Sequence, residues 1–230
     1  MTGIDLAEVA TTLGRGPAVF IDSASPLFSQ VPDRWRSIAA AGQPQDRCTT
    51  ALSLWNTDFC ALVPRFSAAL ATKLVDVRVC HLRGEWVLVY VAPAFAEPHA
   101  TWIGHLPADT QTPPASWSLL PEPVQDFLST VHGGFTAPDG ESYGVIRPSD
   151  MVSYVRWATG SDEPDPDWDE GQPLSSARMT FIGKDGGLTH YCVSPDLPPG
   201  QVALVYEGEI DPGLQFGPAL DDCMMGRFEG

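Results

Sequence analysis

The sequence has few basic residues and no long hydrophobic run. Its 230 residues include 13 Lys and Arg against 29 Asp and Glu, a formal net charge of −16. Such a charge repels nucleic acid and anionic membranes and attracts basic proteins. No apolar stretch approaches the roughly 20 residues of a membrane-spanning helix, and the first residues lack the basic and apolar regions of a secretory signal. We therefore expect a cytoplasmic protein that binds neither nucleic acid nor a membrane.

Metal-ligand patterns are also missing. The five cysteines are scattered and form no C-x-x-C pair, so we expect them to be reduced, with several buried as small apolar side chains. The five histidines show no ligand spacing either. We predict no metal and no cofactor. We place His132 at the end of a helix, where the helix dipole favours its cationic form.

The negative charge is concentrated in the second half of the chain. Residues 1–116 contain ten acidic and eight basic residues, whereas residues 117–230 contain nineteen acidic and five basic ones. The stretch 107–116 is rich in Pro, Thr and Ser and is the best candidate for a linker. We therefore predict an N-terminal unit over residues 1–110 and a second domain over residues 111–230.

Hydrophobic periodicity predicts a mixture of helices and strands. One stripe of apolar residues at i, i+4, i+7, i+8 and i+11 marks an amphipathic helix from Leu120 to Val131. Trp86–Val91 is apolar on both faces, which indicates a central strand, and Asp185-Gly186 favours a tight hairpin turn with positive φ. Further helices are predicted over 5–13, 32–41, 51–60, 64–74, 148–157 and 218–228, and strands over 18–21, 75–82, 101–105, 143–146, 177–183, 188–193 and 202–210.

The order of these parts resembles the SUKH superfamily, whose members include bacterial immunity proteins against polymorphic toxins and a fungal regulator of cell-wall synthesis. The strand with a Gly-rich turn, the further strands and the short closing helix follow in the family's order, and the resemblance covers about the last half of the chain. The features that carry it are Trp117, Leu120-Pro121, a helix ending in Gly133-Gly134, and Tyr143-Gly144 before the next helix.

The resemblance implies an α+β fold with a mostly antiparallel, twisted sheet and packed helices in the second half. The N-terminal half would then be a second α+β unit, or an elaboration of the same domain. It also implies a non-enzymatic immunity protein that binds a cognate toxin domain in the cytoplasm. Because nuclease clefts are basic, a nuclease is the first candidate for the toxin. An intracellular regulatory scaffold that binds several partners is the alternative.

The acidic stretch Ser161–Gln172 is the main candidate for a binding surface. It fails as a calcium loop because Gly171 comes one position late and the twelfth position is not glutamate. It reads either as a solvated loop or as a docking surface for a basic protein, with Trp168 as an apolar anchor. The predicted partner-binding residues are Asp162, Glu163, Asp165, Asp167, Trp168, Asp169, Glu170, Glu207, Glu209 and Asp211.

A serine-hydrolase motif is the third alternative. Gly140–Gly144 matches G-x-S-x-G, and His132-Gly133-Gly134 is similar to an oxyanion-hole segment. A nucleophile elbow needs a hydrophobic strand before the serine and a helix directly after it. A polar turn precedes Ser142 and a strand is predicted after it. We therefore read the segment as a helix cap and a turn, and we predict no catalytic residue.

Overall fold

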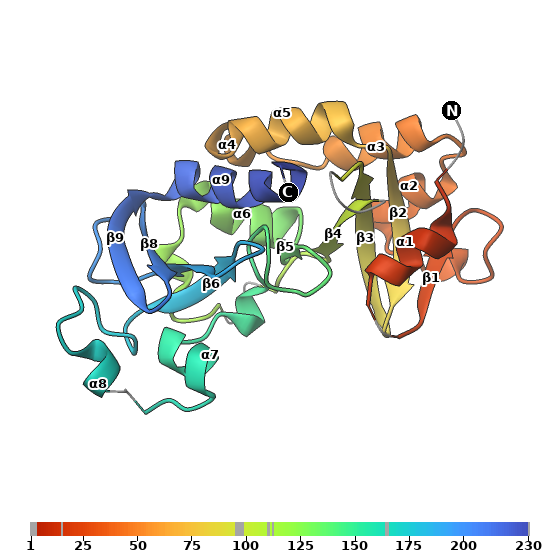
Figure 1. The fold of residues 1–230 in the computed structure, drawn as a ribbon. Helices are drawn as coiled ribbons and strands as arrows, with labels where there is room; N and C mark the ends of the chain where they lie inside the picture. The colour runs from red at the N-terminus through yellow and green to blue at the C-terminus, as the bar shows by residue number, and fades with distance from the viewer. Residues whose placement is uncertain are drawn as a thin grey trace.

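In a computed structural model the chain has an α+β fold with two antiparallel sheets (Figure 1). The structure describes residues 4–14, 16–94, 99–109, 111, 113–163 and 166–229, with only the backbone of residues 166 and 167. The first sheet has the order β1-β2-β3-β4-β5 and the second the order β6-β7-β8-β9. The predicted fold class, with its antiparallel pairing and packed helices, is thereby confirmed.

The elements follow one another as helices, a sheet, more helices and a second sheet. The strands are β1 (Ala18–Ile21), β2 (Asp76–Leu82), β3 (Glu85–Ala92), β4 (Ala100–His105), β5 (Phe135–Thr136), β6 (Thr180–Lys184), β7 (Thr189–Val193), β8 (Gln201–Tyr206) and β9 (Glu209–Gln215). The α-helices are α1 (Leu6–Thr12), α2 (Arg36–Ala40), α3 (Pro44–Leu52), α4 (Thr57–Leu62), α5 (Pro64–Lys73), α6 (Glu122–Thr130), α7 (Tyr154–Thr159), α8 (Pro166–Asp169) and α9 (Phe216–Glu229). Short 3-10 helices are η1 (Phe28–Gln30), η2 (Asp33–Trp35), η3 (Trp117–Leu119) and η4 (Pro148–Asp150).

The first sheet is covered on both faces. β3 lies between β2 and β4, as its two apolar faces predicted. One face packs on α1 through Val9 and Leu13, which form a small cluster with Val87, Val89 and other residues. The opposite face belongs to the main core, which α2–α6 and α9 also build. Because both faces of the sheet are covered, apolar residues occupy consecutive positions of β3.

An aromatic cluster forms the centre of the main core. Phe59 of α4 stacks on Phe127 of α6 with 4.0 Å between ring centroids, and Trp55 meets Phe127 edge-on at 5.0 Å. Edge-to-face and offset pairs of this kind are favourable beyond the area they bury. Four of the five cysteines are also buried, and all five are free thiols. The apolar stripe of α6 thus serves the packing role that its spacing predicted.

Helix α9 connects the two sheets. Its Phe228 lies 4.9 Å from the ring of Trp102 on β4, while α9 also contacts β8 and β9. In Figure 1 α9 runs beside α5 above the second sheet, with α7 and α8 below that sheet. β5, which follows residue 111, pairs with β4 of the first sheet. The core is therefore continuous, and the division at residue 110 stays a prediction.

A buried ion pair ties α3 to the first sheet. Arg47 and Asp76 are 3% and 1% exposed, and two hydrogen bonds of 2.7 and 2.8 Å join the guanidinium to the carboxylate. Arg78 adds a third bond to Asp76 (2.7 Å), and Arg47 also donates to the Ala41 carbonyl (2.9 Å). The pair is satisfied on both sides, as buried charges require.

His132 is a neutral core residue, which corrects the prediction of a cationic histidine. It follows α6, as expected, but is 0% exposed. Burial lowers the pKa of His132 to about 3, since the charged imidazole would lose its hydration. Its ring hydrogen-bonds the Tyr90 hydroxyl (2.8 Å) and the His105 carbonyl (3.1 Å), and Trp55 Nε1 donates to the same hydroxyl (3.2 Å).

Several of the predicted elements are wrong in extent or geometry, and the helix expected over 32–41 is the short η2 followed by α2. The helix expected over 51–60 is broken between α3 and α4, and the strand expected over 143–146 contributes only an isolated bridge from Val145 to Phe135. The helix expected over 148–157 is the short η4 followed by α7. The strand expected over 202–210 turns back after Tyr206, so β8 and β9 form a hairpin.

The hairpin at Asp185 exists, but its geometry differs from the prediction. Positive φ is absent at Gly186 and Gly187, and the loop is instead held by the Asp185 carboxylate, which accepts from the N–H groups of Gly187 (2.7 Å) and Thr189 (3.1 Å). A Cβ on Gly186 would lie 1.5 Å from the Tyr143 hydroxyl. A side chain at Gly186 would therefore require Tyr143 to shift.

Candidate partner-binding surface

The segment after α7 folds back onto the turn between β8 and β9. The turn residues Glu207 and Gly208 have φ of 49° and 87°, which is typical of a two-residue type I′ hairpin. Gln172 Nε2 donates to the Gly208 carbonyl (3.0 Å), and a Cβ on Gly208 would lie 3.5 Å from Trp168 Nε1. The fold thus brings the 168–172 part of the first predicted acidic segment beside the turn of the second, 207–211.

Six of the ten predicted residues are exposed, and we call this set the acidic edge. Asp162 pairs with Arg156 (3.2 Å); within the described part of the chain, the other five make no ion pair. Asp165 and the side chain of Asp167 lie outside the described residues. The members of the acidic edge are Asp162, Glu163, Glu170, Glu207, Glu209 and Asp211.

Asp169 performs a local structural role. Its carboxylate accepts from the Ser175 hydroxyl (2.8 Å) and from the Ser176 N–H (2.9 Å). Burial raises the pKa of Asp169, but these hydrogen bonds outweigh burial and lower the pKa below its ordinary value. The group therefore stays ionised while it anchors the segment that follows α8. Of the predicted carboxylates, this one is turned toward its own chain.

Trp168 packs against the core and is only partly exposed. Its ring lies 5.7 Å from the ring of Tyr154, and Tyr154 in turn stacks on Trp157 at 5.7 Å. Trp157 stacks on Phe181 of β6 at 4.4 Å. The aromatic residues of α7 and α8 thus hold the acidic loop against the lower face of the second sheet.

Two exposed apolar residues beside the acidic edge were not predicted. Leu188 and Tyr206 are 56% and 53% exposed. Thr189, which follows Leu188, lies opposite Tyr206, and Tyr206 lies opposite Glu209. The register therefore places the Tyr206 side chain next to the Glu209 carboxylate, and Leu188 lies in the loop just before β7. In the sequence, each of these positions shows only a single apolar residue near the end of a strand. Such a residue can be recognised as part of a surface only when the pairing of the strands is known.

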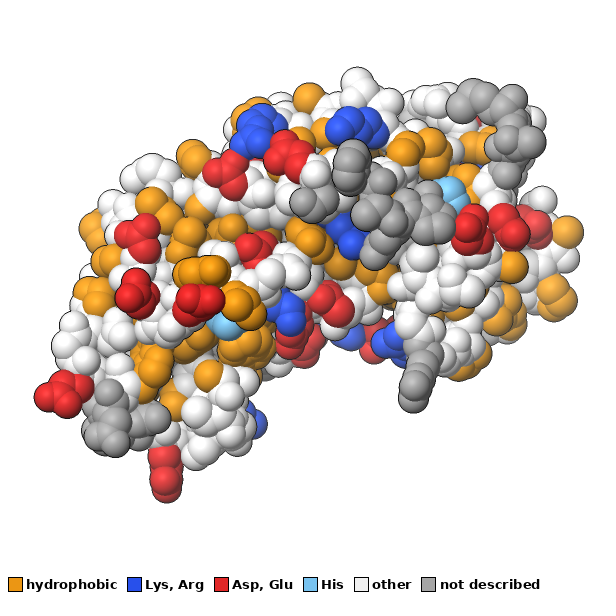
Figure 2. Space-filling model, in the orientation of Figure 1, with side chains coloured by type: hydrophobic (Ala, Val, Ile, Leu, Met, Phe, Trp, Pro, Cys, Tyr) orange, Lys and Arg blue, Asp and Glu red, His pale blue; other side chains and the backbone are white. Residues whose placement is uncertain are grey.

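The basic residues of the second half are mostly neutralised elsewhere. Ion pairs join Arg147 to Glu85 (2.9 Å), Arg178 to Asp196 (2.6 Å) and Lys184 to Glu141 (2.8 Å). Figure 2 shows Asp and Glu side chains scattered among apolar ones over the region of β8, β9 and α8, with Lys and Arg lying elsewhere on that face. Charge complementarity of this kind favours a basic partner.

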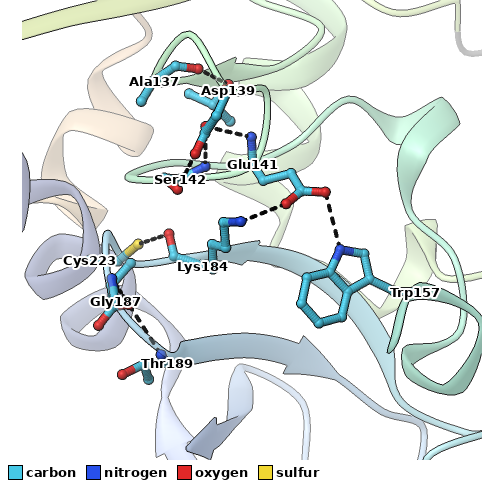
Figure 3. Close-up of polar contacts among 11 residues, drawn as sticks. Ala137, Asp139, Glu141, Ser142, Trp157, Lys184, Gly187, Thr189 and Cys223 are labelled. Atoms are coloured by element: carbon cyan, nitrogen blue, oxygen red, sulfur yellow. Dashed lines mark hydrogen bonds and ion pairs between the residues drawn. The ribbon is translucent and has the colours of Figure 1, made fainter. Parts of the chain in front are cut away.

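The G-x-S-x-G segment forms a hydrogen-bonded turn. Ser142 is 3% exposed and its hydroxyl donates to Asp139, whose other oxygen accepts from the N–H groups of Glu141 (3.0 Å) and Ser142 (2.9 Å). Burial raises the pKa of Asp139, but these bonds and Lys184 lower it overall. In Figure 3 the Ser142 side chain points toward Asp139, away from Lys184 and Trp157.

Glu141 occupies the other side of that turn. It accepts from Lys184 Nζ (2.8 Å) and from Trp157 Nε1 (3.2 Å), as Figure 3 shows. The motif therefore joins the turn to β6 and α7. The nearest histidine in sequence and the one downstream of Ser142 have other partners: His132 bonds Tyr90, and His190 bonds the Tyr154 hydroxyl (2.9 Å). Among the described residues, no hydrogen bond links Ser142 to a histidine.

A groove of about 680 Å³ lies beside the β2–β3 turn of the first sheet, between that turn and the segments 105–117 and 147–151. Apolar residues, including Trp86, Leu106 and Trp117, form much of its wall. Two of its charged groups neutralise each other, because Glu85 pairs with Arg147 (2.9 Å), and Glu85 also lies 3.4 Å from His105. Burial, followed by the charge of Arg147, lowers the pKa of His105. The groove offers less charge selectivity than the acidic edge.

Comparisons with known proteins do not identify a relative. No protein-family model, curated protein or solved structure matches the chain. The SUKH resemblance therefore stays a prediction from the sequence. Among the described helices, none combines the length and apolarity that a bilayer crossing needs. Across the same residues, no three His, Cys, Asp or Glu side chains are grouped in a way that could hold a metal ion.

Proposed function

We propose that this protein is an immunity protein that binds a basic toxin domain and blocks it. The observation that carries the proposal is the acidic edge, where two segments about 40 residues apart in sequence are held together by the β8–β9 turn. The SUKH resemblance supplies the class of partner. Uncompensated carboxylates raise the association rate of a basic partner, because the attraction acts before contact.

The exposed apolar pair gives the same surface a means of slow dissociation. Interfaces have an apolar centre and a polar rim, and tyrosine is common among the residues that contribute most. Tyr206 lies opposite Glu209 on paired strands, and the equally exposed Leu188 lies in the loop just before β7. The sheet holds the backbone of Tyr206 in place, so little backbone entropy of that residue is lost on binding. Carboxylates would set the association rate, and this pair would set the residence time.

Co-expression with the product of the neighbouring gene tests the function. If that gene encodes the toxin, cells that make the toxin alone should stop growing, and cells that also make this protein should grow. A catalytically inactive toxin should co-purify with it. Continued killing in the presence of folded protein, with no complex, would contradict the proposal. The toxin identified in this way is the partner for the kinetic predictions below.

Neutralising the acidic edge is expected to slow association by about tenfold at low salt. The variant combines Glu207→Gln, Glu209→Gln and Asp211→Asn, which removes three exposed charges from β9 and its turn. Stopped-flow measurements of partner binding should show the loss, and it should shrink as salt is added because screening already weakens the wild-type attraction.

The matched control removes three exposed charges from helices α3, α4 and α6. It combines Asp46→Asn, Asp58→Asn and Asp126→Asn, all at exposed positions. Its net charge equals that of the first variant, so a general effect of charge would slow both equally. We expect the control to bind at nearly the wild-type rate. Equal slowing of the two variants would contradict a localised acidic binding surface.

Removing the apolar pair is expected to act on dissociation instead. Leu188→Ser with Tyr206→Ser should raise the dissociation rate by roughly 10- to 100-fold, since hot-spot side chains contribute about 1–3 kcal/mol. The association rate should change little. Val19→Ser removes a side chain that is 43% exposed on β1 and serves as control. Unchanged dissociation in the double variant would place the contact elsewhere.

A further inference from the structure

Strand β9 forms the outer border of the second sheet and has a free edge (Figure 1). Of the other outer strands, β5 is covered because Phe135 and Val145 exchange two backbone hydrogen bonds (2.9 and 3.1 Å). The segment 141–154 covers β6, for example where the Ile146 N–H donates to the Ile182 carbonyl (3.0 Å). β1 has four residues, none of them charged. β9 has seven residues, and among the described residues its backbone bonds no segment other than β8.

The hydrogen-bond pattern along β8 decides which backbone groups of β9 point outward. In an antiparallel pair, opposed residues alternate between bonded and non-bonded pairs. The two-residue turn makes Tyr206 and Glu209 a bonded pair. The Gly200 carbonyl accepts from the Phe216 N–H (2.9 Å), which gives the same alternation along β8. Ile210 occupies the next, non-bonded position. Its N–H and carbonyl therefore point away from β8, and neither has a partner within the described part of the chain.

The side chains around this open position favour a basic strand. Glu209 and Asp211 flank Ile210 and point to the opposite face of the sheet, because successive side chains of a strand alternate. Both carboxylates are exposed and form no ion pair with another described residue, whereas Ile210 packs partly on the core. Opposite charges directly across a strand pair are favourable. An added strand would fit best with an apolar residue between two basic ones.

A second copy of this chain is a poor occupant of the same edge. Pairing two β9 strands at Ile210 would place Glu209 of each copy opposite Asp211 of the other, and like charges across a strand pair are unfavourable. Charges and proline on an outer strand commonly prevent such pairing between copies. Pro212 also has no N–H to offer, so an added strand can pair only over a few residues around Ile210. None of these features opposes a short basic strand.

We propose that the edge of β9 accepts an extended segment of the partner protein, in which an apolar residue pairs with Ile210 between two lysines or arginines. The added strand would form two backbone hydrogen bonds with Ile210 and place its basic side chains against Glu209 and Asp211. In strand addition of this kind, main-chain bonds contribute affinity and alternate side chains contribute specificity. The owner of the segment rests on the proposed function, whereas the free edge does not.

Amide exchange in the free protein tests whether the edge is open. The Asp211 N–H faces Leu204 in the next bonded pair, whereas the Ile210 N–H has no acceptor. We expect the Ile210 amide to exchange at least about tenfold faster than the Asp211 amide, because an N–H without an acceptor needs no opening step. Equal or slower exchange at Ile210 would show that the edge is covered and would overturn the proposal.

Titration with a short peptide tests whether the edge takes a strand. The probe is acetyl-Thr-Lys-Val-Lys-Thr-amide, and ¹⁵N NMR follows the Ile210 amide. We expect a saturable shift with a Kd of about 1–10 mM, since two hydrogen bonds and two exposed charge pairs give weak binding. The same peptide with N-methylvaline keeps both charges but lacks the central N–H, and should bind at least about tenfold more weakly. Acetyl-Thr-Glu-Val-Glu-Thr-amide should leave the signal unmoved.

Two results of this titration would overturn the proposal. Equal binding of the N-methylated peptide would show a charge contact without strand pairing. No saturable shift up to about 50 mM peptide, well above the weakest Kd expected, would show that no strand binds. On the protein side, Glu209→Gln with Asp211→Asn should weaken binding of the lysine peptide about fivefold, and Asp46→Asn with Asp58→Asn should not. Equal weakening by both variants would contradict a contact at β9.

Failure of strand addition and failure of the proposed function give different results. If the toxin is bound and neutralised but the Ile210 amide exchanges as fast in the complex as in the free protein, the function stands and strand addition falls. If the lysine peptide pairs with β9 but no toxin is found, the open edge stands and the function falls. Both proposals are supported when the toxin is neutralised and the Ile210 amide gains protection in the complex.

Discussion

Replacing Asp76 with alanine is expected to lower the free energy of unfolding by about 3–5 kcal/mol, because it leaves a buried charge without its partner. Arg47 is 3% exposed, and its guanidinium would lose both bonds to the carboxylate. Water cannot easily replace them at this depth. Urea denaturation should therefore show a much lower midpoint, with the slope unchanged if the fold is retained.

An exposed pair offers the control for this prediction. Asp33 pairs with Arg36, but their side chains are 89% and 47% exposed. Exposed pairs contribute little because water and salt screen them, so Asp33→Ala should leave the midpoint almost unchanged. Similar midpoints for Asp76→Ala and Asp33→Ala would show that the Arg47–Asp76 pair does not hold α3 on the first sheet.

Gly144→Ala is expected to destabilise the protein by about 3 kcal/mol or more, as severe overpacking against a backbone atom does. A Cβ at this position would lie 1.8 Å from the Phe135 carbonyl oxygen, on a backbone that pairs Val145 with Phe135. Backbone cannot move aside as a flexible side chain can. Chemical denaturation of the purified variant, or its failure to fold, is the measurement.

The other residues of the motif should tolerate change better. Gly140→Ala meets no atom within 4 Å, although φ is +85° there, so we expect a cost of about 1–2 kcal/mol from backbone strain alone. Ser142→Ala loses one hydrogen bond to Asp139 and should cost about 1 kcal/mol. Equal stability of the Gly144→Ala and Gly140→Ala variants would contradict the packing role of Gly144. If Ser142 were the nucleophile of a serine hydrolase, Ser142→Ala would instead abolish hydrolase activity.

Secondary structure was predictable where one pattern dominated. The apolar stripe of α6 and the two apolar faces of β3 each have a single structural solution, and the structure has both. The predicted helix over 51–60 failed because Ser53–Asn56 forms a turn that carries Trp55 into the core. Its apolar spacing resembled a helix, but tertiary packing of Trp55 decided the backbone.

The candidate surface was predictable in composition but not in arrangement. The acidic bias identified residues 161–172 and 207–211, yet the hairpin at Glu207 was missed because a glutamate with positive φ carries no strong local signal. Without that hairpin, Tyr206 has no neighbour on β9. The inward orientation of Asp169 depends on hydrogen bonds from the Ser175 hydroxyl and the Ser176 N–H. No rule of sequence spacing predicts such a contact.

The most direct test of the proposed surface is a hydrogen-exchange footprint of the protein bound to its partner. Backbone amides that a partner covers exchange more slowly in the complex. We predict new protection in 166–172, in the hairpin from β6 to β7 near Leu188, and in 204–211, with little change in α2 to α5. Protection confined to those helices, or to the groove near Trp86 and Trp117, would contradict the assignment of the acidic edge as the binding surface.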